Sequence, residues 1–403
     1  MSPNPFALHH PDRIYLDHNA TTPLAQGLGD ELVVWCSRWG NPSSIHWDGR
    51  GPKTLLREAR QNVAALVGSD PLEIIFTSGG SEANNLAIKG VFDSRRLNDF
   101  SGQRLSDRPR FLMSAVEHPS VRKTMEYIAR QGADVHVIPV DRDGQIDLMA
   151  YDELLNEQTS LVSVMYANNE TGNIFPVKKM AKMAHEVGAL FHCDGVQALG
   201  KAVVDVKKWE VDLASFSGHK FYGLKGGGFL YASKGVHLES LIHGGGQERG
   251  RRAGTENVLS IASMGWMARF KSEVEQRAGE TKDLRDHLES RITKEITGTS
   301  VTGREGKRLP NTSCVLIPGI DGETLLMNLD MKGFAVSTGA ACSAGNPEPS
   351  PVLLAMGLSR EEAQSTLRVS LGWGTTCEDI NQFVDALKET VDRLRSLHAE
   401  GAE

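Results

Sequence analysis

The chain has 403 residues, of which 40% are hydrophobic and 24% charged, proportions that are typical of soluble globular proteins. Its net charge of −7 argues against nucleic acid as the main partner, and its apolar runs are too short to span a membrane. The length predicts two domains. The N-terminus lacks a signal-peptide pattern, and the five cysteines form no CxxC pair. These features argue against a disulfide framework and a zinc site, and they favour a reducing, cytoplasmic location.

Short apolar runs alternate with helical patterns between residues 54 and 232, which predicts a series of βαβ units. The first helix expected in this region covers residues 54–67, where apolar side chains recur with a period close to 3.6. The expected strands are EIIFTS, FLMSAVEH, ADVHVIPV, LVSVMYA, LFHCD, DLASFS and GGFLYAS.

The pattern changes near residue 258. We expect one long helix over 262–297, two short strands (SCVLIPG and FAVSTG) and an amphipathic last helix, which begins where Thr375 and Glu378 have the spacing of a capping box. The expected fold class is α/β: a large domain over 16–260, with a mainly parallel mixed sheet flanked by helices, and a smaller α+β domain. We assign residues 1–15 and 261–403 to the smaller domain.

A glycine turn follows the first of these strands, in IIFTSGGSEANN. The backbone at Gly80 and the hydroxyl of Ser81 would lie at the N-terminus of a helix, which is a position suited to phosphate. An ordinary helix cap is the alternative interpretation.

Two charged residues follow neighbouring strands. Asp194 ends LFHCD, where it either caps the next helix or pairs with a cationic ring nitrogen. Lys220 follows DLASFS, where it is either a surface lysine or an amine nucleophile that is partly withdrawn from water. Because ligands bind at the carboxyl ends of strands in open α/β sheets, both residues are candidates for one site.

Small and hydroxylated residues surround Lys220. Ser217 and His219 could bind an anion, and the glycines 226–228 would allow close passage beside a ligand. A lysine, an aspartate and phosphate-binding turns are the groups that hold pyridoxal phosphate in proteins.

Four further residues are candidates. His118 ends a predicted strand, where it is either a packed histidine or a group that stacks on a cofactor ring or exchanges protons. Asn168 is either a turn residue or a ligand contact. Cys342 lies among small residues and prolines, which favours a reactive thiol in an accessible loop. Arg368 lies within a strand-like run, so it needs an anion if it is buried, and a substrate carboxylate would serve.

As a set, these segments resemble the NifS/IscS-like cysteine desulfurases, which belong to the class V branch of the fold-type I pyridoxal-phosphate enzymes. The resemblance covers nearly the whole chain, and one departure is Gly195, where alanine is usual in the family. The matching segments are YLDHNATTPL, GNPSSIH, FTSGGSEANN, AVEHPSV, NNETG, HCDGVQ, SGHKFYG, GGGQERGRRAGTEN, STGAACSAGNPEPS and LRVSLG.

The resemblance implies a role for each candidate. Lys220 would hold the cofactor covalently and move protons at the substrate, while Cys342 would attack the substrate's sulfur. His118 would stack on the ring, Asp194 would pair with its nitrogen and Gln197 with its hydroxyl. The resemblance also assigns phosphate contacts to Gly80, Ser81, Ser217, His219 and, from the other subunit of a homodimer, Thr255, and substrate contacts to Asn41, Asn168 and Arg368.

The implied reaction converts L-cysteine to L-alanine and leaves a persulfide on Cys342. The sulfur would pass to an acceptor or iron–sulfur scaffold protein, or to thio-modification. A selenocysteine lyase or another class V enzyme, such as a transaminase, is the enzymatic alternative, and a non-enzymatic scaffold is the third hypothesis. Persulfide formation at Cys342 distinguishes the first hypothesis from the others.

Overall fold

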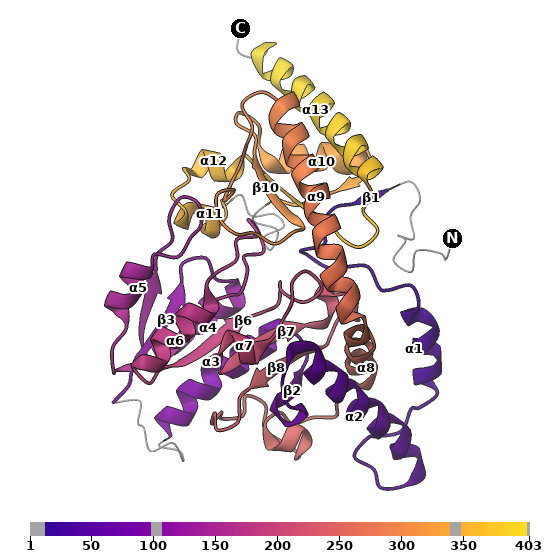
Figure 1. Cartoon of the computed structure of the whole chain (residues 1–403), viewed down its shortest axis with the longest axis vertical. Helices are drawn as coiled ribbons and strands as arrows, with labels where there is room; N and C mark the ends of the chain where they lie inside the picture. Colours follow the sequence, from indigo (N-terminus) through magenta and orange to yellow (C-terminus); the bar gives the residue numbers. More distant parts are fainter. Residues whose placement is uncertain (1–12, 98–106, 339–347, 401–403) are drawn as a thin grey trace.

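The computed structural model describes residues 13–97, 107–338 and 348–400 (Figure 1). Cys342, the predicted nucleophile, lies outside the described residues. None of the helices within these ranges is long and apolar enough to cross a bilayer.

The larger part of the fold is a seven-stranded sheet in the order β2-β8-β7-β6-β5-β3-β4. Within this sheet β8 runs antiparallel to both β2 and β7, and the other pairings between its strands are parallel, so the predicted mainly parallel mixed sheet is confirmed. The strands are β2 (Ile74–Thr77), β3 (Arg110–Ser114), β4 (Asp134–Ile138), β5 (Thr159–Ser163), β6 (Leu190–Asp194), β7 (Leu213–Ser217) and β8 (Gly228–Ala232).

Helices cover both faces of this sheet because its strands are apolar on both sides. One apolar cluster joins the sheet to α3 (Gly80–Arg96) and α4 (Pro119–Arg130). The other joins it to helices on the opposite face, which are α2 (Trp47–Val67), α5 (Leu148–Leu154), α6 (Val177–Glu186), α7 (Val206–Trp209) and α8 (Val258–Met267), with α1 (Leu28–Cys36) at its margin.

The smaller part lies at the other end of the molecule, where α9 (Lys271–Glu295) and α13 (Cys377–Glu400) run side by side (Figure 1). Their apolar faces pack on an antiparallel sheet in the order β12-β10-β9. The other elements are β1 (Ile14–Tyr15), β9 (Ser300–Val301), β10 (Thr312–Leu316), α10 (Gly322–Met331), β11 (Phe334–Ala335), α11 (Pro351–Ala355), α12 (Arg360–Gln364) and β12 (Thr366–Ser370). The expected smaller α+β region is thus present.

The helix predicted over 262–297 is divided in two. A short 3-10 segment, Ala268–Phe270, separates α8 from α9. The N-terminal piece packs on α2 so closely that a Cβ at Gly265 would lie 2.4 Å from Ala59 Cα. Ile261 and Met264 belong to the core of the large sheet. We therefore propose that the domain boundary follows α8 and does not lie at residue 260.

Two helix starts also differ from the prediction. The helix expected from residue 54 begins at Trp47. The last helix has its capping box one residue later than expected: Thr376 Oγ1 accepts from the Asp379 N–H at 3.1 Å, and Asp379 accepts from the Thr376 N–H at 2.8 Å. Threonine and aspartate satisfy the same backbone groups in either register, so spacing alone does not fix it.

The site is positioned by the carboxyl ends of the parallel strands, which lie at one edge of the large sheet. The N-terminal segment reaches this edge after β1 pairs with β11, and the main-chain N–H of Ser370 donates to Leu16 O at 2.8 Å. Residues distant in sequence are therefore brought to one place.

Candidate active site

A cavity of about 730 Å³ opens at this edge of the sheet. That volume is in the range of small-molecule and cofactor sites. The predicted residues that line it are Gly80, Ser81, His118, Asp194, Gln197, Ser217, His219, Lys220 and Arg368. The fold thus collects nine of the thirteen predicted site residues around one cavity.

Lys220 lies in a short 3-10 turn directly after β7. Its Nζ donates to the main-chain oxygens of Asn19 and Ala20, at 2.6 and 2.8 Å. These two residues belong to YLDHNATTPL, the first of the segments that carry the family resemblance. The lysine amine is therefore held at the wall of the cavity by the start of the chain.

Asp194 is the last residue of β6 and is buried. Its Oδ2 accepts from Asn84 Nδ2 at 2.8 Å, and its Oδ1 accepts from the Val196 N–H at 3.0 Å. Within the described ranges, no lysine or arginine forms an ion pair with this carboxylate. A buried carboxylate that is oriented but lacks a cationic partner suits a cationic ring nitrogen.

His118 caps α4 and lies beside this carboxylate. The main-chain N–H of Ser120 donates to its Nδ1 at 3.1 Å, so the neutral ring carries its proton on Nε2. Burial lowers the pKa of His118, and Lys220 lowers it further, whereas Asp194 raises it. The imidazole is thus favoured in its neutral form, with Nε2 as a donor.

The N-terminus of α3 supplies the candidate phosphate site, and Ser217 and His219 line the same cavity, with Ser217 Cβ 3.6 Å from where a Cβ of Gly80 would lie. Close packing requires glycine in the turn: a Cβ at Gly80 would lie 2.6 Å from Val196 Cγ2. His219 Nδ1 is 3.1 Å from Thr21 Oγ1, and burial lowers the pKa of His219 to about 4. Backbone N–H groups, a hydroxyl and the helix dipole together favour an anion here.

Gly195 follows the site carboxylate and is packed closely. A Cβ there would lie 2.5 Å from the ring of Phe216, which itself stacks on Phe229 at a centroid distance of 4.7 Å. The departure from alanine noted in the sequence is therefore matched by a bulky neighbour, so this place is not loosely packed.

Arg368 lies in β12 and is buried. Its Nη2 pairs with Asp17 Oδ1 at 2.8 Å, and its Nη1 donates to Asn169 O at 3.2 Å. Among the described residues, none accepts from its Nε. Because Arg368 also lines the cavity, its guanidinium is placed to bind a further anion there.

Four predicted residues do not line the cavity. Asn168 is buried behind it, where its Oδ1 accepts the N–H groups of Glu170 and Thr171 at 2.8 and 3.1 Å, while its neighbour Asn169 lines the cavity. Asn41 and Thr255 are exposed elsewhere. Cys342, the fourth, lies outside the described residues.

The structure adds cavity residues that the sequence did not single out. Asn84 orients the Asp194 carboxylate, and its place in FTSGGSEANN was the signal available for it. Glu117 lines the cavity beside His118, and burial raises its pKa to about 8. Lys201 lies behind the wall, four residues after Gln197, with no distinctive sequence pattern around it.

Comparison with known proteins agrees with this geometry. Residues 14–383 match the aminotransferase class-V family. A cysteine desulfurase from Cereibacter sphaeroides is 43% identical over 97% of this chain and 99% of its own length.

Two solved structures are also similar. A structure titled NIFS-LIKE PROTEIN has a TM-score of 0.86 and 36% identity, covering 94% of this chain and 99% of its own. SspA in complex with cysteine has a TM-score of 0.76 and 31% identity, covering 90% and 99%. The chain therefore belongs to the aminotransferase class-V family and, within it, to the NifS/IscS-like cysteine desulfurases.

Proposed function

We propose that this protein is a cysteine desulfurase that uses pyridoxal phosphate to convert L-cysteine to L-alanine. The observation that carries the proposal is the assembly of Lys220, Asp194 and Arg368 around one cavity, although they come from distant parts of the chain. The names of the similar proteins support the same activity.

The residues present fit pyridoxal phosphate. Asp194 offers a buried carboxylate to the ring nitrogen, Lys220 offers an amine, and the N-terminus of α3 offers donors to the phosphate. When bound, this cofactor supplies an electron sink for negative charge at the substrate's α-carbon. His118 would stack on its ring and, with a proton on Nε2, serve as a proton donor.

The substrate carboxylate would bind the donors that remain on Arg368. Because Asn169 lines the cavity and the side chain of Asn168 is turned into the fold, we assign the substrate contact to Asn169. Lys220 would remove the α-proton and return one to the product.

In the sulfur-transfer step, the Cys342 thiolate would attack the substrate's sulfur. The S–S bond of the persulfide would form as the substrate's C–S bond breaks, and the carbon would take a proton to become the methyl group of alanine. Sulfur is thereby oxidised as carbon is reduced, so no external oxidant is needed. A sulfur-acceptor or iron–sulfur scaffold protein would then receive the sulfur.

We also propose a homodimer in which Thr255 serves the partner's phosphate site. Thr255 is exposed and does not line the cavity of its own chain. Several large apolar side chains near the N-terminus are exposed as well, namely Val33, Trp39, Ile45 and Trp47. Large apolar side chains that are exposed within one short stretch of the chain are typical of a surface that another chain covers. A monomer by light scattering would contradict this arrangement.

The decisive experiment incubates the purified protein with L-cysteine and measures alanine, together with the mass of the peptide that contains Cys342. One added sulfur atom is expected on that peptide. Cys342→Ala should abolish sulfur transfer, whereas Cys377→Ala, which changes an exposed cysteine, should not. Undiminished turnover in Cys342→Ala would overturn the persulfide mechanism and favour another class V activity. The scaffold hypothesis would be favoured if the purified protein showed no visible cofactor band and its absorbance did not change in Lys220→Ala.

A further inference from the structure

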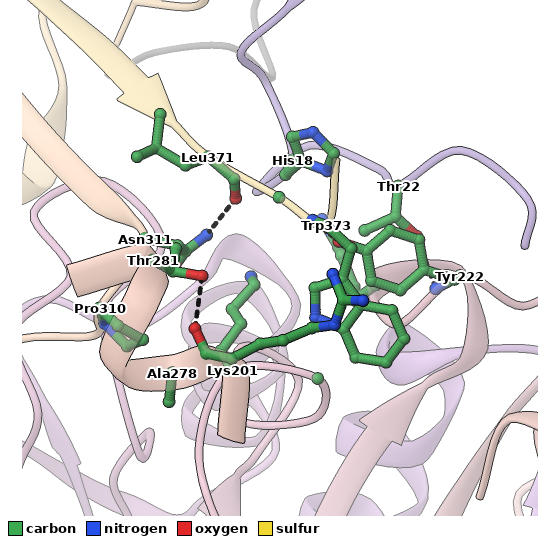
Figure 2. A pocket seen from close by; sticks show the side chains of 14 residues that line it. His18, Thr22, Lys201, Tyr222, Ala278, Thr281, Pro310, Asn311, Leu371 and Trp373 are labelled. Atoms are coloured by element: carbon green, nitrogen blue, oxygen red, sulfur yellow. Dashed lines mark hydrogen bonds between the residues drawn. The ribbon is translucent and has the colours of Figure 1, made fainter. Parts of the chain in front are cut away.

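A buried lysine, Lys201, lies behind the cavity wall. Lys201 Nζ donates to Asn19 Oδ1 at 2.9 Å and also to Gln197 Oε1. It lines a small pocket, shown in Figure 2, whose volume of about 20 Å³ leaves room for no ligand larger than water. Lys220 lines this pocket as well as the large cavity, so the two spaces are neighbours. The residues around the small pocket therefore back the wall of the active site, and the pocket is not a separate binding site.

The contacts of Gln197 fix which way its amide points. Its Nε2 donates to the main-chain oxygen of Asn19 at 3.1 Å, and a carbonyl oxygen can only accept. On the other side, its Oε1 accepts from Lys201. These two contacts engage one of the two lone pairs of the amide oxygen and one of the two N–H bonds. Because Gln197 also lines the large cavity, its second N–H is a donor that it can offer a ligand.

The charges around Lys201 do not explain its burial. Lys220 and Arg368 are like charges, and both lower the pKa of Lys201 together with burial. Asp17 is the opposite charge that favours the protonated form, and Lys201 in turn lowers the pKa of the buried His18. Among the described residues, Lys201 forms no ion pair with a carboxylate. A costly group of this kind is expected where function requires it.

We propose that Lys201 is a positioning residue for the bound cofactor, which it reaches through Gln197. By engaging the amide oxygen, it leaves an N–H of Gln197 to donate to the oxygen on the cofactor ring. A donor favours the ionised form of that oxygen. The inference rests on the proposed function because it requires pyridoxal phosphate in the cavity.

The test is Lys201→Met in the cofactor-loaded protein. We expect the pH midpoint of the visible absorbance band to rise by about 0.5 to 1 unit, because the protonated form of the bound cofactor gains favour when a donor is lost. We also expect the affinity of the cofactor-free protein for pyridoxal phosphate to fall about tenfold. Lys208→Met is the matched control, since the Lys208 side chain is 82% exposed. An unchanged midpoint in Lys201→Met would overturn the proposal and leave Lys201 a structural residue.

A double-mutant cycle tests the route through Gln197. Gln197→Leu should raise the midpoint by itself, and Lys201→Met should add little on that background. If the two shifts add fully, Lys201 acts by its charge alone and the positioning role is wrong.

A folding defect can be separated from the proposed effect. Thermal unfolding of the cofactor-free protein measures stability alone, and Lys201→Gln keeps an N–H donor toward Gln197 while removing the charge. The pH midpoint of Lys201→Gln should therefore lie between that of the wild-type protein and that of Lys201→Met. A midpoint equal to that of Lys201→Met contradicts the positioning role. A wild-type protein that binds pyridoxal phosphate and desulfurates cysteine, with no shift in any variant, overturns this inference alone. A wild-type protein that binds no pyridoxal phosphate overturns the proposed function.

Discussion

Two arginines whose side chains are buried show how the active-site end of this molecule differs from the smaller domain. Arg308 lies in the smaller domain, where its Nη1 and Nη2 pair with the two oxygens of Glu289 at 2.7 and 2.9 Å. Arg368 pairs with Asp17 through one nitrogen, and its Nε lacks an acceptor among the described residues. Arg308 is paired with a carboxylate through two nitrogens, whereas Arg368 is paired through one nitrogen and lines the cavity.

The difference extends to the surrounding groups. Three buried polar atoms that lack a partner among the described residues belong to residues that line the cavity, namely Asn84 Oδ1, Glu117 Oε2 and Arg368 Nε. An unsatisfied buried group costs free energy unless a ligand satisfies it. The unsatisfied groups at the cavity therefore destabilise the empty protein, and a ligand that hydrogen-bonds to them removes this cost. The Arg308–Glu289 pair in the smaller domain contributes to folding alone.

The largest expected effect is on stability, from Arg308→Met. Removing the arginine leaves Glu289 buried without its partner, so the free energy of unfolding should fall by about 3–5 kcal/mol. Chemical denaturation measures this loss. The double change Arg308→Met with Glu289→Leu should recover most of it, and an equal loss in the double variant would contradict the interpretation of a closed pair.

Arg368→Met should lower activity strongly and stability only moderately, in contrast to Arg308→Met. We expect kcat/KM for L-cysteine to fall about 100-fold, mainly through a higher KM, because the substrate carboxylate loses a charged donor. Stability should fall less than in Arg308→Met, since the Asp17 side chain that is left behind is 18% exposed. Steady-state kinetics and denaturation of the same sample provide both numbers. A purely structural arginine would show the opposite ranking.

Glu117→Gln sharpens the comparison through pH. The pKa of Glu117 is raised to about 8 by burial and by Asp194, so between its ordinary value and pH 8 the folded protein keeps a proton that the unfolded chain has lost. The free energy of unfolding should therefore fall as pH rises through this window, on the order of 1 kcal/mol for each pH unit. The glutamine variant should lack this contribution. Parallel stability curves for both proteins from acid to neutral pH would exclude a protonated Glu117.

The smallest effect is expected at the surface of the smaller domain. Arg291 pairs with Glu295 and with Asp385, whose side chain is 70% exposed. Asp385→Ala should change the free energy of unfolding by less than about 1 kcal/mol, and added salt should remove even this difference. A larger loss that persists at high salt would mean that this network resembles the buried pair.

The sequence predicted the strands of the large sheet well because each is a short apolar run between turn residues. It also predicted that Asp194 and Lys220 follow neighbouring strands, and β6 and β7 do pair in parallel. It did not predict the antiparallel direction of β8 or the division between α8 and α9, because both depend on what each segment packs against.

Among the site residues, the asparagine pair shows where local reasoning stops. Asn168 and Asn169 are adjacent and chemically identical, yet one caps a turn inside the fold and the other lines the cavity. Lys201 was not singled out, since its acceptors lie on Asn19, far away in the chain, and on Gln197. Neither distinction is visible to spacing or composition.

The sequence by itself determined the local elements and which residue types stand at their ends, because hydrophobic periodicity and turn chemistry act over a few neighbouring residues. Only the tertiary structure decided which arginine pairs with a carboxylate through two nitrogens and which pairs through one. The roles of Arg308 and Arg368 differ because both oxygens of Glu289 pair with Arg308, while only one oxygen of Asp17 pairs with Arg368. Such pairing is set by contacts between distant segments, which form only when the whole chain folds.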